Sequence, residues 1–295
     1  MEEKVRQMRM KWAAGDVVRD AGVIDPEDVV RCTDLPYGEH PDNLLDVYYP
    51  EGTTGNLPTI ISIHGGGWFY GSKELYSHYC LRLAKRGFTV VNFDYRLAPE
   101  HQYPAPLEDT FRVITWMQQN ADACHIDLNN VFVVGDSAGG QIAFQVLTML
   151  TNPKYAAMFS FPVPEGFSVR ACGLNCGCYF FPPFGRFLSP EKANILFKLY
   201  FPDDYLPIVP QLKAHKYVTR DFPPAFVMSS GNDYLKIMAK PLHLLLKFRG
   251  VQSVCKVFGT KKDKELGHVF HLNCKLPQAD LCNDIQCQFF RDHMA

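Results

Sequence analysis

The sequence predicts an α/β protein whose mostly parallel sheet is covered by helices on both faces. Short apolar runs alternate with helical patterns along the first half of the chain, as in Thr59–Ile63, Phe88–Phe93 and Val131–Val134. These runs are almost continuously apolar, which is typical of strands buried on both faces of a parallel sheet. A length of 295 residues suits one large domain with an insertion at least as well as two domains.

The N-terminal segment is predicted to form helices outside this core. Val5, Met8, Trp12 and the pair Val17–Val18 are spaced for one apolar face of a helix. We therefore assign residues 1–28 to N-terminal cap helices.

Residues 29–178 are predicted to form the first part of the core. Within it, Arg96 and Asp109 are expected to pin a loop rather than to take part in catalysis. The expected elements are strands over 29–36 and 44–49 joined by a hairpin turn at 40–43, a strand over 59–63, a helix over 73–86, a strand over 88–93, a helix over 107–120, a turn at 127–130, a strand over 131–134, a helix over 142–150 and a strand over 171–176.

Residues 179–220 interrupt this pattern. They lack strand alternation and are too long for an ordinary connection, so we expect a cap insertion that covers the site. Phe180, Phe181 and Phe184 are either core residues of this cap or the lining of an apolar pocket, and we place them in the substrate pocket. Residues 221–295 then complete the core, with strands over 224–230 and 252–258 and helices over 235–248 and 277–293.

Composition and charge exclude several classes of partner. Lys and Arg total 30 against 31 Asp and Glu, so no net field attracts nucleic acid or an anionic membrane. No apolar run approaches the length of a membrane span, and the charged start Met1–Arg6 lacks the apolar segment of a secretory signal. We expect a cytoplasmic protein with no stable membrane anchor and with reduced cysteines. The spacing of Cys172, Cys176 and Cys178 is not that of a zinc site, and small buried residues on a strand are the favoured interpretation.

A serine lies at a sharp turn between a strand and a helix. Gly135-Asp136-Ser137-Ala138-Gly139 follows the apolar run that ends at Val134. This pattern is typical of the nucleophile elbow of serine hydrolases, in which the serine hydroxyl projects above the sheet. Ser137 is therefore the candidate nucleophile, and its neighbour Asp136 is assigned to the substrate pocket.

A second motif follows the strand at 59–63. His64-Gly65-Gly66-Gly67-Trp68 places three glycines after a strand, where backbone N–H groups can turn toward one point. We predict an oxyanion hole made by the N–H groups of Gly65, Gly66 and Ala138, with His64 and Gly67 shaping the loop. The adjoining aromatic residues Trp68, Phe69 and Tyr70 are assigned to the substrate pocket.

A nucleophilic serine needs a base, and the base needs an orienting carboxylate. In this fold class the chain order is nucleophile, acid, histidine, each at the end of a strand. Asp233 and His268 satisfy this order, since each follows one of the last two predicted strands. His271 competes with His268, which is preferred because a glycine precedes it in the loop. His64 precedes the glycine loop and is not the base.

The chain resembles the hormone-sensitive lipase family of esterases within the α/β-hydrolase fold. The motifs that carry the resemblance are His64–Trp68, Asp94–Glu100, Gly135–Gly140, Gly231–Leu235 and Gly267–Phe270, the last with Val269 where the family often has glycine. The resemblance implies a mostly parallel eight-stranded sheet with a helical cap. It also implies hydrolysis of short- to medium-chain carboxylic esters without a metal or cofactor, with substrate choice made in the cap.

The expected reaction is ester hydrolysis through an acyl-enzyme intermediate, with a small-molecule ester as the partner. One alternative is an amidase or deacetylase acting on acylated drugs or sugars. Another is a non-catalytic ligand-binding relative of the fold, although such relatives usually lose a residue of the triad and none is missing here. A homodimer is left open.

Overall fold

A single eight-stranded sheet organises the protein. The structure, a computed structural model, describes residues 2–181 and 190–295. The strand order is β1-β2-β4-β3-β5-β6-β7-β8, and only the pairs β1/β2 and β2/β4 are antiparallel. The strands span Val29–Pro36 (β1), Leu44–Pro50 (β2), Leu57–Ile63 (β3), Thr89–Phe93 (β4), Ile126–Asp136 (β5), Ala171–Asn175 (β6), Ala225–Ser230 (β7) and Ser253–Phe258 (β8).

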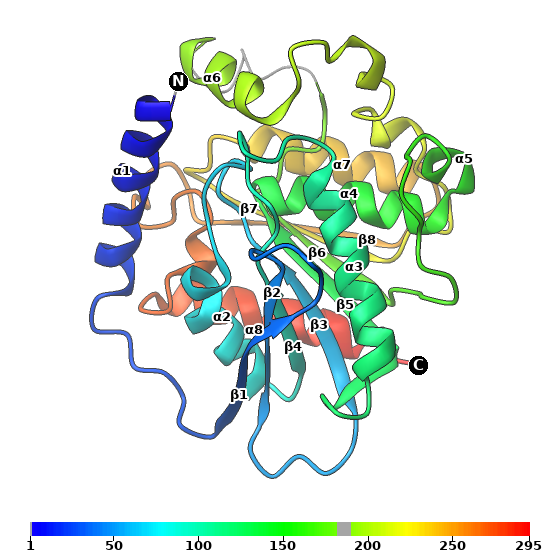
Figure 1. The fold of residues 1–295 in the computed structure, drawn as a ribbon. Helices are drawn as coiled ribbons and strands as arrows, with labels where there is room; N and C mark the ends of the chain where they lie inside the picture. Colours follow the sequence, from blue (N-terminus) through cyan, green and yellow to red (C-terminus); the bar gives the residue numbers. More distant parts are fainter. Residues whose placement is uncertain (1, 182–189) are drawn as a thin grey trace.

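Helices cover the sheet on both sides (Figure 1). They span Glu2–Asp20 (α1), Lys73–Lys85 (α2), Ala105–Asn120 (α3), Ala138–Thr151 (α4), Pro153–Ala156 (α5), Pro190–Tyr200 (α6), Lys236–Phe248 (α7) and Pro277–Arg291 (α8), with short 3₁₀ turns at Leu206–Ile208 (η2), Ala214–Lys216 (η3) and Phe270–Leu272 (η4). None of the helices in the described ranges is long and apolar enough to cross a membrane.

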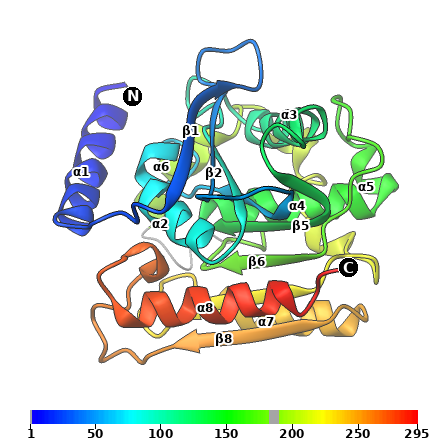
Figure 2. The same ribbon diagram turned by 90° about the horizontal axis from the view of Figure 1, so that it is seen from below.

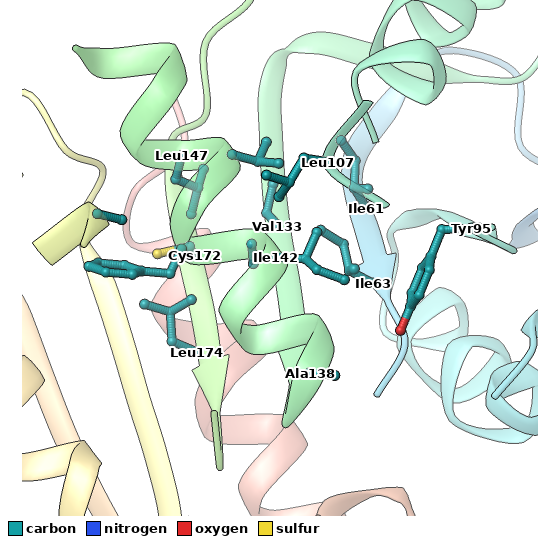
Figure 3. Close-up of a cluster of buried hydrophobic side chains, with 14 of the residues drawn as sticks. Ile61, Ile63, Tyr95, Leu107, Val133, Ala138, Ile142, Leu147, Cys172 and Leu174 are labelled. Carbon is teal, nitrogen blue, oxygen red and sulfur yellow. The ribbon is translucent and has the colours of Figure 1, made fainter. Parts of the chain in front are cut away.

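The two faces of the sheet carry separate apolar cores. Strand residues that point to one face, such as Ile61 and Val133, pack with α3, α4 and α7. Their neighbours along the strand, such as Ile60 and Phe132, point to the other face and pack with α2 and α8. Figure 3 shows the first core, where side chains of β3, β5 and β6 meet Ile142 of α4. This alternation explains why the strands are apolar almost without interruption.

The N-terminal segment differs from the predicted cap helices. It forms one helix, α1, and residues 21–28 are non-helical. Val17 and Val18 are 70% and 73% exposed, so they do not extend the apolar face, and Val5 is the buried residue of this helix. Figures 1 and 2 show α1 along one side of the molecule, outside the helical layers. Ionic and backbone contacts hold it there, including the Arg9 guanidinium on Glu100 and on the Phe69 carbonyl.

The elbow strand also differs from prediction. β5 begins at Ile126 rather than after a turn at 127–130, and its pairing with β3 shifts register between Pro58 and Thr59. The polar residues Asp127, Asn129 and Asn130 belong to this irregular stretch, where side-chain hydrogen bonds replace part of the regular ladder. The remaining predicted helices and strands occur where expected, with their ends moved by a few residues.

Candidate active site

The elbow residue Ser137 has an unusual backbone conformation. It lies between β5 and α4 with φ 52° and ψ −114°, a combination that costs energy in an L-residue. Close packing holds it there, because a Cβ on Gly135 would lie 2.4 Å from the Gly139 oxygen and one on Gly139 would lie 2.0 Å from the Ile63 oxygen. Only glycine fits at these two positions. The conformation presents the serine hydroxyl to the cavity above the carboxyl end of the sheet.

Three predicted residues from distant parts of the chain meet at this point. Nε2 of His268 lies 2.9 Å from Oγ of Ser137, and its Nδ1 lies 2.7 Å from Oδ1 of Asp233. Asp233 follows β7, and His268 lies in the loop between β8 and η4. The carboxylate, imidazole and hydroxyl therefore form one continuous hydrogen-bonded chain.

The carboxylate of Asp233 is fixed by further hydrogen bonds. Its Oδ2 accepts from the Ser229 hydroxyl at 2.7 Å, and Oδ1 also accepts from the Leu235 N–H at 2.9 Å. Burial would raise the pKa of Asp233, but the hydrogen bond and charge of His268, together with these donors, hold the pKa below its ordinary value. Asp233 therefore remains an anion that can orient and stabilise a protonated imidazole.

The two other candidate histidines lie away from the nucleophile. His271 is fully buried against Tyr79, and burial lowers its pKa to about 3. His64 is buried with its ring stacked on Tyr95 at 4.0 Å, its Nδ1 donates to the Gly65 carbonyl, and burial lowers its pKa to about 4. Both are neutral, and His64 contacts the glycine loop through the Gly65 carbonyl.

The predicted oxyanion role of Gly65 is wrong. Its N–H donates to the phenolic oxygen of Tyr76 at 2.7 Å, and that hydroxyl donates to Asp136 at 2.9 Å. A buried N–H that already has an acceptor is not available to a substrate. The prediction placed the donors one residue too early, because a run of three glycines does not show which amide points into the site.

The next two amides of the loop are available. Gly66 and Gly67 have positive φ angles of 112° and 60°, and within the described residues neither N–H has an acceptor. Ala138 is the first residue of α4, so its N–H has no acceptor inside the helix. All three residues line the cavity beside Ser137.

Asp136 is a buried structural residue rather than an exposed pocket residue. Its side chain borders the cavity but is 3% exposed, and it accepts the Tyr76 hydrogen bond. Burial raises its pKa to about 7, a shift that the Tyr76 hydrogen bond partly offsets. Asp136 and Tyr76 thus tie the elbow to the glycine loop that follows β3.

A cavity of about 380 Å³ lies over Ser137 and His268, and its wall is mainly apolar. Trp68 and Tyr70 line it, as predicted. Phe69 is buried behind the loop against Trp12, while Phe180 packs on His215 and Phe181 on Phe201, so none of these three lines the cavity. Phe184 lies outside the described residues.

Several lining residues were not predicted. Tyr234, 43% exposed, lines the cavity and places its ring 4.2 Å from that of His268. Cys178 and the α1 residues Trp12, Asp16 and Arg19 also line the cavity. The position of Tyr234 beside Asp233 could have indicated it, whereas nothing in the sequence of α1 indicates which of its faces meets the site.

Two groups of side chains in the described ranges are close enough to share a metal ion. Cys176, Asp233 and His268 form one group, which coincides with the hydrogen-bonded chain at Ser137. Burial raises the pKa of the Cys176 thiol well above its ordinary value. His40, Asp42 and His101 form the second group, in which both histidines are partly exposed and Asp42 is exposed.

Residues 60–272 match the model of a protein family described as the alpha/beta hydrolase fold. The chain belongs to the α/β-hydrolase fold family. This confirms the predicted fold class, and the similar proteins described next support the resemblance drawn from the motifs.

Other members of the α/β-hydrolase fold family resemble the chain at low to moderate identity. Esterase LipC of Mycobacterium tuberculosis is 30% identical over 217 residues, covering 67% of this chain and 50% of LipC. Carboxylesterase NlhH of the same species is 40% identical over 119 residues, covering 40% of this chain and 37% of NlhH. The chain therefore spans about half, or less, of the length of these curated relatives. Among solved structures, esterase B from Lactobacillus rhamnosis superposes with a TM-score of 0.91 at 27% identity, covering 99% of this chain and 94% of that one.

Proposed function

We propose that the protein is a serine carboxylesterase that hydrolyses short- to medium-chain carboxylic esters. The observation that carries the proposal is the hydrogen-bonded chain from Asp233 through His268 to Ser137, at the wall of a mainly apolar cavity. The similar proteins include esterases, and the structure of esterase B with a tributyrin phosphonate superposes with a TM-score of 0.90 at 27% identity.

The proposed first half of the reaction acylates the serine. Ser137 Oγ attacks the ester carbonyl carbon while Nε2 of His268 accepts the hydroxyl proton, which gives a tetrahedral intermediate and an imidazolium. The Asp233 carboxylate stabilises the imidazolium through Nδ1. The intermediate then collapses, the bond to the alkoxy oxygen breaks, and His268 returns its proton to the departing alcohol.

The negative charge of the intermediate needs hydrogen-bond donors. We assign this role to the N–H groups of Gly66, Gly67 and Ala138, because these amides are free of acceptors and border the cavity at Ser137. Such donors are each worth roughly 2.7–4 kcal/mol of transition-state stabilisation. Gly65 contributes indirectly by holding the loop through Tyr76.

Deacylation uses the same groups. Water gives a proton to His268 as its oxygen attacks the acyl carbon, the second intermediate is held by the same amides, and collapse releases the carboxylic acid and restores the Ser137 hydroxyl. No cofactor is required for either half. The ring of Tyr234 covers one side of His268 and reduces access of solvent to the imidazole.

The direct test is hydrolysis of p-nitrophenyl acetate and butyrate by the purified protein and by Ser137→Ala. We expect the substitution to abolish hydrolysis and also covalent labelling by a fluorophosphonate. Retained hydrolysis in the purified variant would contradict the assignment of the nucleophile. Matched ester and amide substrates compare the esterase with an amidase, and we expect the ester of each pair to react faster because its alkoxide is the better leaving group.

A further inference from the structure

The catalytic cavity has a neighbour beneath α1. A second cavity of about 570 Å³ lies between the same helix and the core. Three residues, Tyr70, Gly71 and Leu75, line both cavities. On α1 the catalytic cavity meets Trp12, Asp16 and Arg19, whereas the second cavity meets Arg9, Met10 and Ala13. The two cavities therefore lie next to each other along α1. The residues that they share, Tyr70, Gly71 and Leu75, form a partition between them.

Tyr70 supplies the side chain of this partition. Its hydroxyl donates to Oδ2 of Asp16 on α1, and its ring contacts the edge of Trp12 with centroids 5.6 Å apart. Gly71 adds no side chain, and it cannot acquire one, because a Cβ there would lie 2.6 Å from Nδ1 of His64. The size and position of the Tyr70 ring thus decide whether the two cavities communicate.

The partition is tied to α1 by a short network. Asp16 accepts from Tyr70 through Oδ2 and from Arg19 through Oδ1 at 2.7 Å, and Arg19 donates in turn to the carbonyl of Leu75 at 3.0 Å. The Tyr70 side chain and the Leu75 backbone are therefore both connected to the helix through one Asp–Arg pair. These groups are largely withdrawn from solvent, with 20% and 17% of the Asp16 and Arg19 side chains exposed.

The second cavity suits an aliphatic chain rather than an ion. Met10, Ala13, Leu75 and Leu97 supply its apolar lining, with Met10 60% exposed. Asp42, Ser72 and Glu100 supply polar lining beside Arg9. The cation at its rim, Arg9, is already bound to the carbonyls of Phe69 and Ala98 and to both carboxylate oxygens of Glu100, which leaves it no strong site for an anion.

We propose that Tyr70 sets the length of the ester arm that the enzyme accepts, by closing the catalytic cavity against the second cavity beneath α1. Short and medium aliphatic arms end against the Tyr70 ring. The second cavity takes the end of a longer arm when this ring is removed or released from Asp16. This inference rests on the proposed esterase activity and names the side chain that limits its substrate range.

The test is a chain-length series of p-nitrophenyl esters, from acetate to dodecanoate, on the wild type and on Tyr70→Ala, Tyr70→Phe and Ala13→Phe. Tyr70→Ala is expected to move the preferred chain upward by about four carbon atoms, roughly the length of one 5.4 Å helical turn of α1. The ratio of kcat/KM for decanoate to that for butyrate should rise about tenfold or more, because one methylene bound in an apolar pocket changes kcat/KM by about tenfold or more. Tyr70→Phe loses only the Asp16 tether and should show a smaller shift in the same direction.

The double variant Tyr70→Ala/Ala13→Phe identifies the route of the chain. A phenyl ring at position 13 fills the second cavity, so the ratio should return to near the wild-type value, whereas Ala13→Phe alone should leave the ratio unchanged. Tyr49→Ala serves as a matched control, since Tyr49 lines neither cavity.

Two results would overturn the inference. One is a Tyr70→Ala protein with the wild-type ratio, and the other is a raised ratio that persists in the double variant. Thermal unfolding of each variant identifies any that fails to fold, in which case the Tyr70→Phe series decides. Failure of the wild type to hydrolyse any ester in the series would instead contradict the proposed function.

Discussion

The amide of Gly65 and the hydroxyl of Tyr76 are 2.7 Å apart, and this hydrogen bond joins the oxyanion loop to helix α2. The same hydroxyl donates to Asp136, the residue before the nucleophile. One buried phenol therefore fixes the distance between the loop that holds the donors and the turn that holds Ser137. A change at Tyr76 should alter catalysis even though Tyr76 is not assigned a chemical step.

Tyr76→Phe removes the acceptor of a buried N–H and one donor to a buried carboxylate. We expect a loss of about 1–3 kcal/mol in the free energy of unfolding, the usual cost of an unsatisfied buried group. We also expect kcat to fall by up to about 10²-fold, with KM little changed, as the donors of the oxyanion loop lose alignment. Urea unfolding and steady-state kinetics measure the two effects.

Tyr79→Phe is the matched control for this substitution. Tyr79 lies on the same helix and is buried, and its hydroxyl has no hydrogen-bond partner among the described residues. Its removal should leave kcat within about twofold of wild type and stability unchanged or slightly raised. If kcat and stability fell equally in Tyr76→Phe and Tyr79→Phe, any change to a buried tyrosine of α2 would disturb the site, and the Tyr76 hydrogen bonds would have no special role.

Asp136 should make stability depend on pH. Burial raises its pKa from its ordinary value to about 7, so the folded protein retains a proton that the unfolded chain releases at lower pH. Its contribution to stability is therefore fully present below the unfolded-state pKa and is lost as the pH rises through about 7. In Asp136→Asn this dependence is absent.

Urea unfolding of wild type and Asp136→Asn at several pH values between 4 and 8 checks this sign. We expect the free energy of unfolding of the wild type to fall relative to the variant by on the order of a few kcal/mol across this range. The comparison cancels the titration of groups common to both proteins, such as Asp94. A difference that stays constant, or that grows in favour of wild type toward pH 8, would contradict the assigned ionisation.

The fold and the meeting of Ser137, Asp233 and His268 could be predicted because each leaves a local pattern. Apolar runs identify strands buried on both faces. Ser137 directly follows β5 and Asp233 lies three residues beyond β7, whereas His268 lies in a loop ten residues beyond β8, a strand that is partly exposed. In a parallel sheet the ends of these strands meet at one edge, so order along the chain becomes proximity in space. The antiparallel pair of the edge strand β1 and its neighbour β2 was equally visible through its hairpin turn.

The details that failed depend on contacts between distant segments. Which glycine amide faces the site is decided by Tyr76, eleven positions further along the chain. The polar helix α1 becomes a cavity wall through Arg9 and Asp16, whose partners lie on other elements. Three aromatic residues assigned to the pocket, Phe69, Phe180 and Phe181, instead pack against Trp12, His215 and Phe201, respectively. Val269 has φ 54°, a left-handed conformation that favours glycine, and the sequence around it gives no sign of this strain.

The two neighbouring histidines should respond in opposite ways to substitution. His268→Gln removes the group that contacts Ser137, so ester hydrolysis should fall to background while the fold is retained. His271→Gln changes a neutral, fully buried side chain that lies against Tyr79, so stability should decrease while kcat stays within a few-fold of wild type. Kinetics combined with thermal unfolding separate these effects. An active His268→Gln protein would reassign the base.

Asp233→Asn tests whether orientation of the imidazole limits the rate. The amide cannot accept from Nδ1 with the strength of a carboxylate, and its NH₂ group favours the tautomer in which Nε2 carries the proton and cannot act as a base toward Ser137. We expect kcat to fall by about 10⁴-fold with little change in KM, the loss reported by this substitution in a Ser-His-Asp arrangement. Ser229→Ala, which removes only the hydrogen bond to Oδ2 of Asp233, should cost far less because the bond to His268 remains. If both variants lost activity equally, the Ser229 hydroxyl would be required to hold the carboxylate, and the triad would extend to a fourth residue.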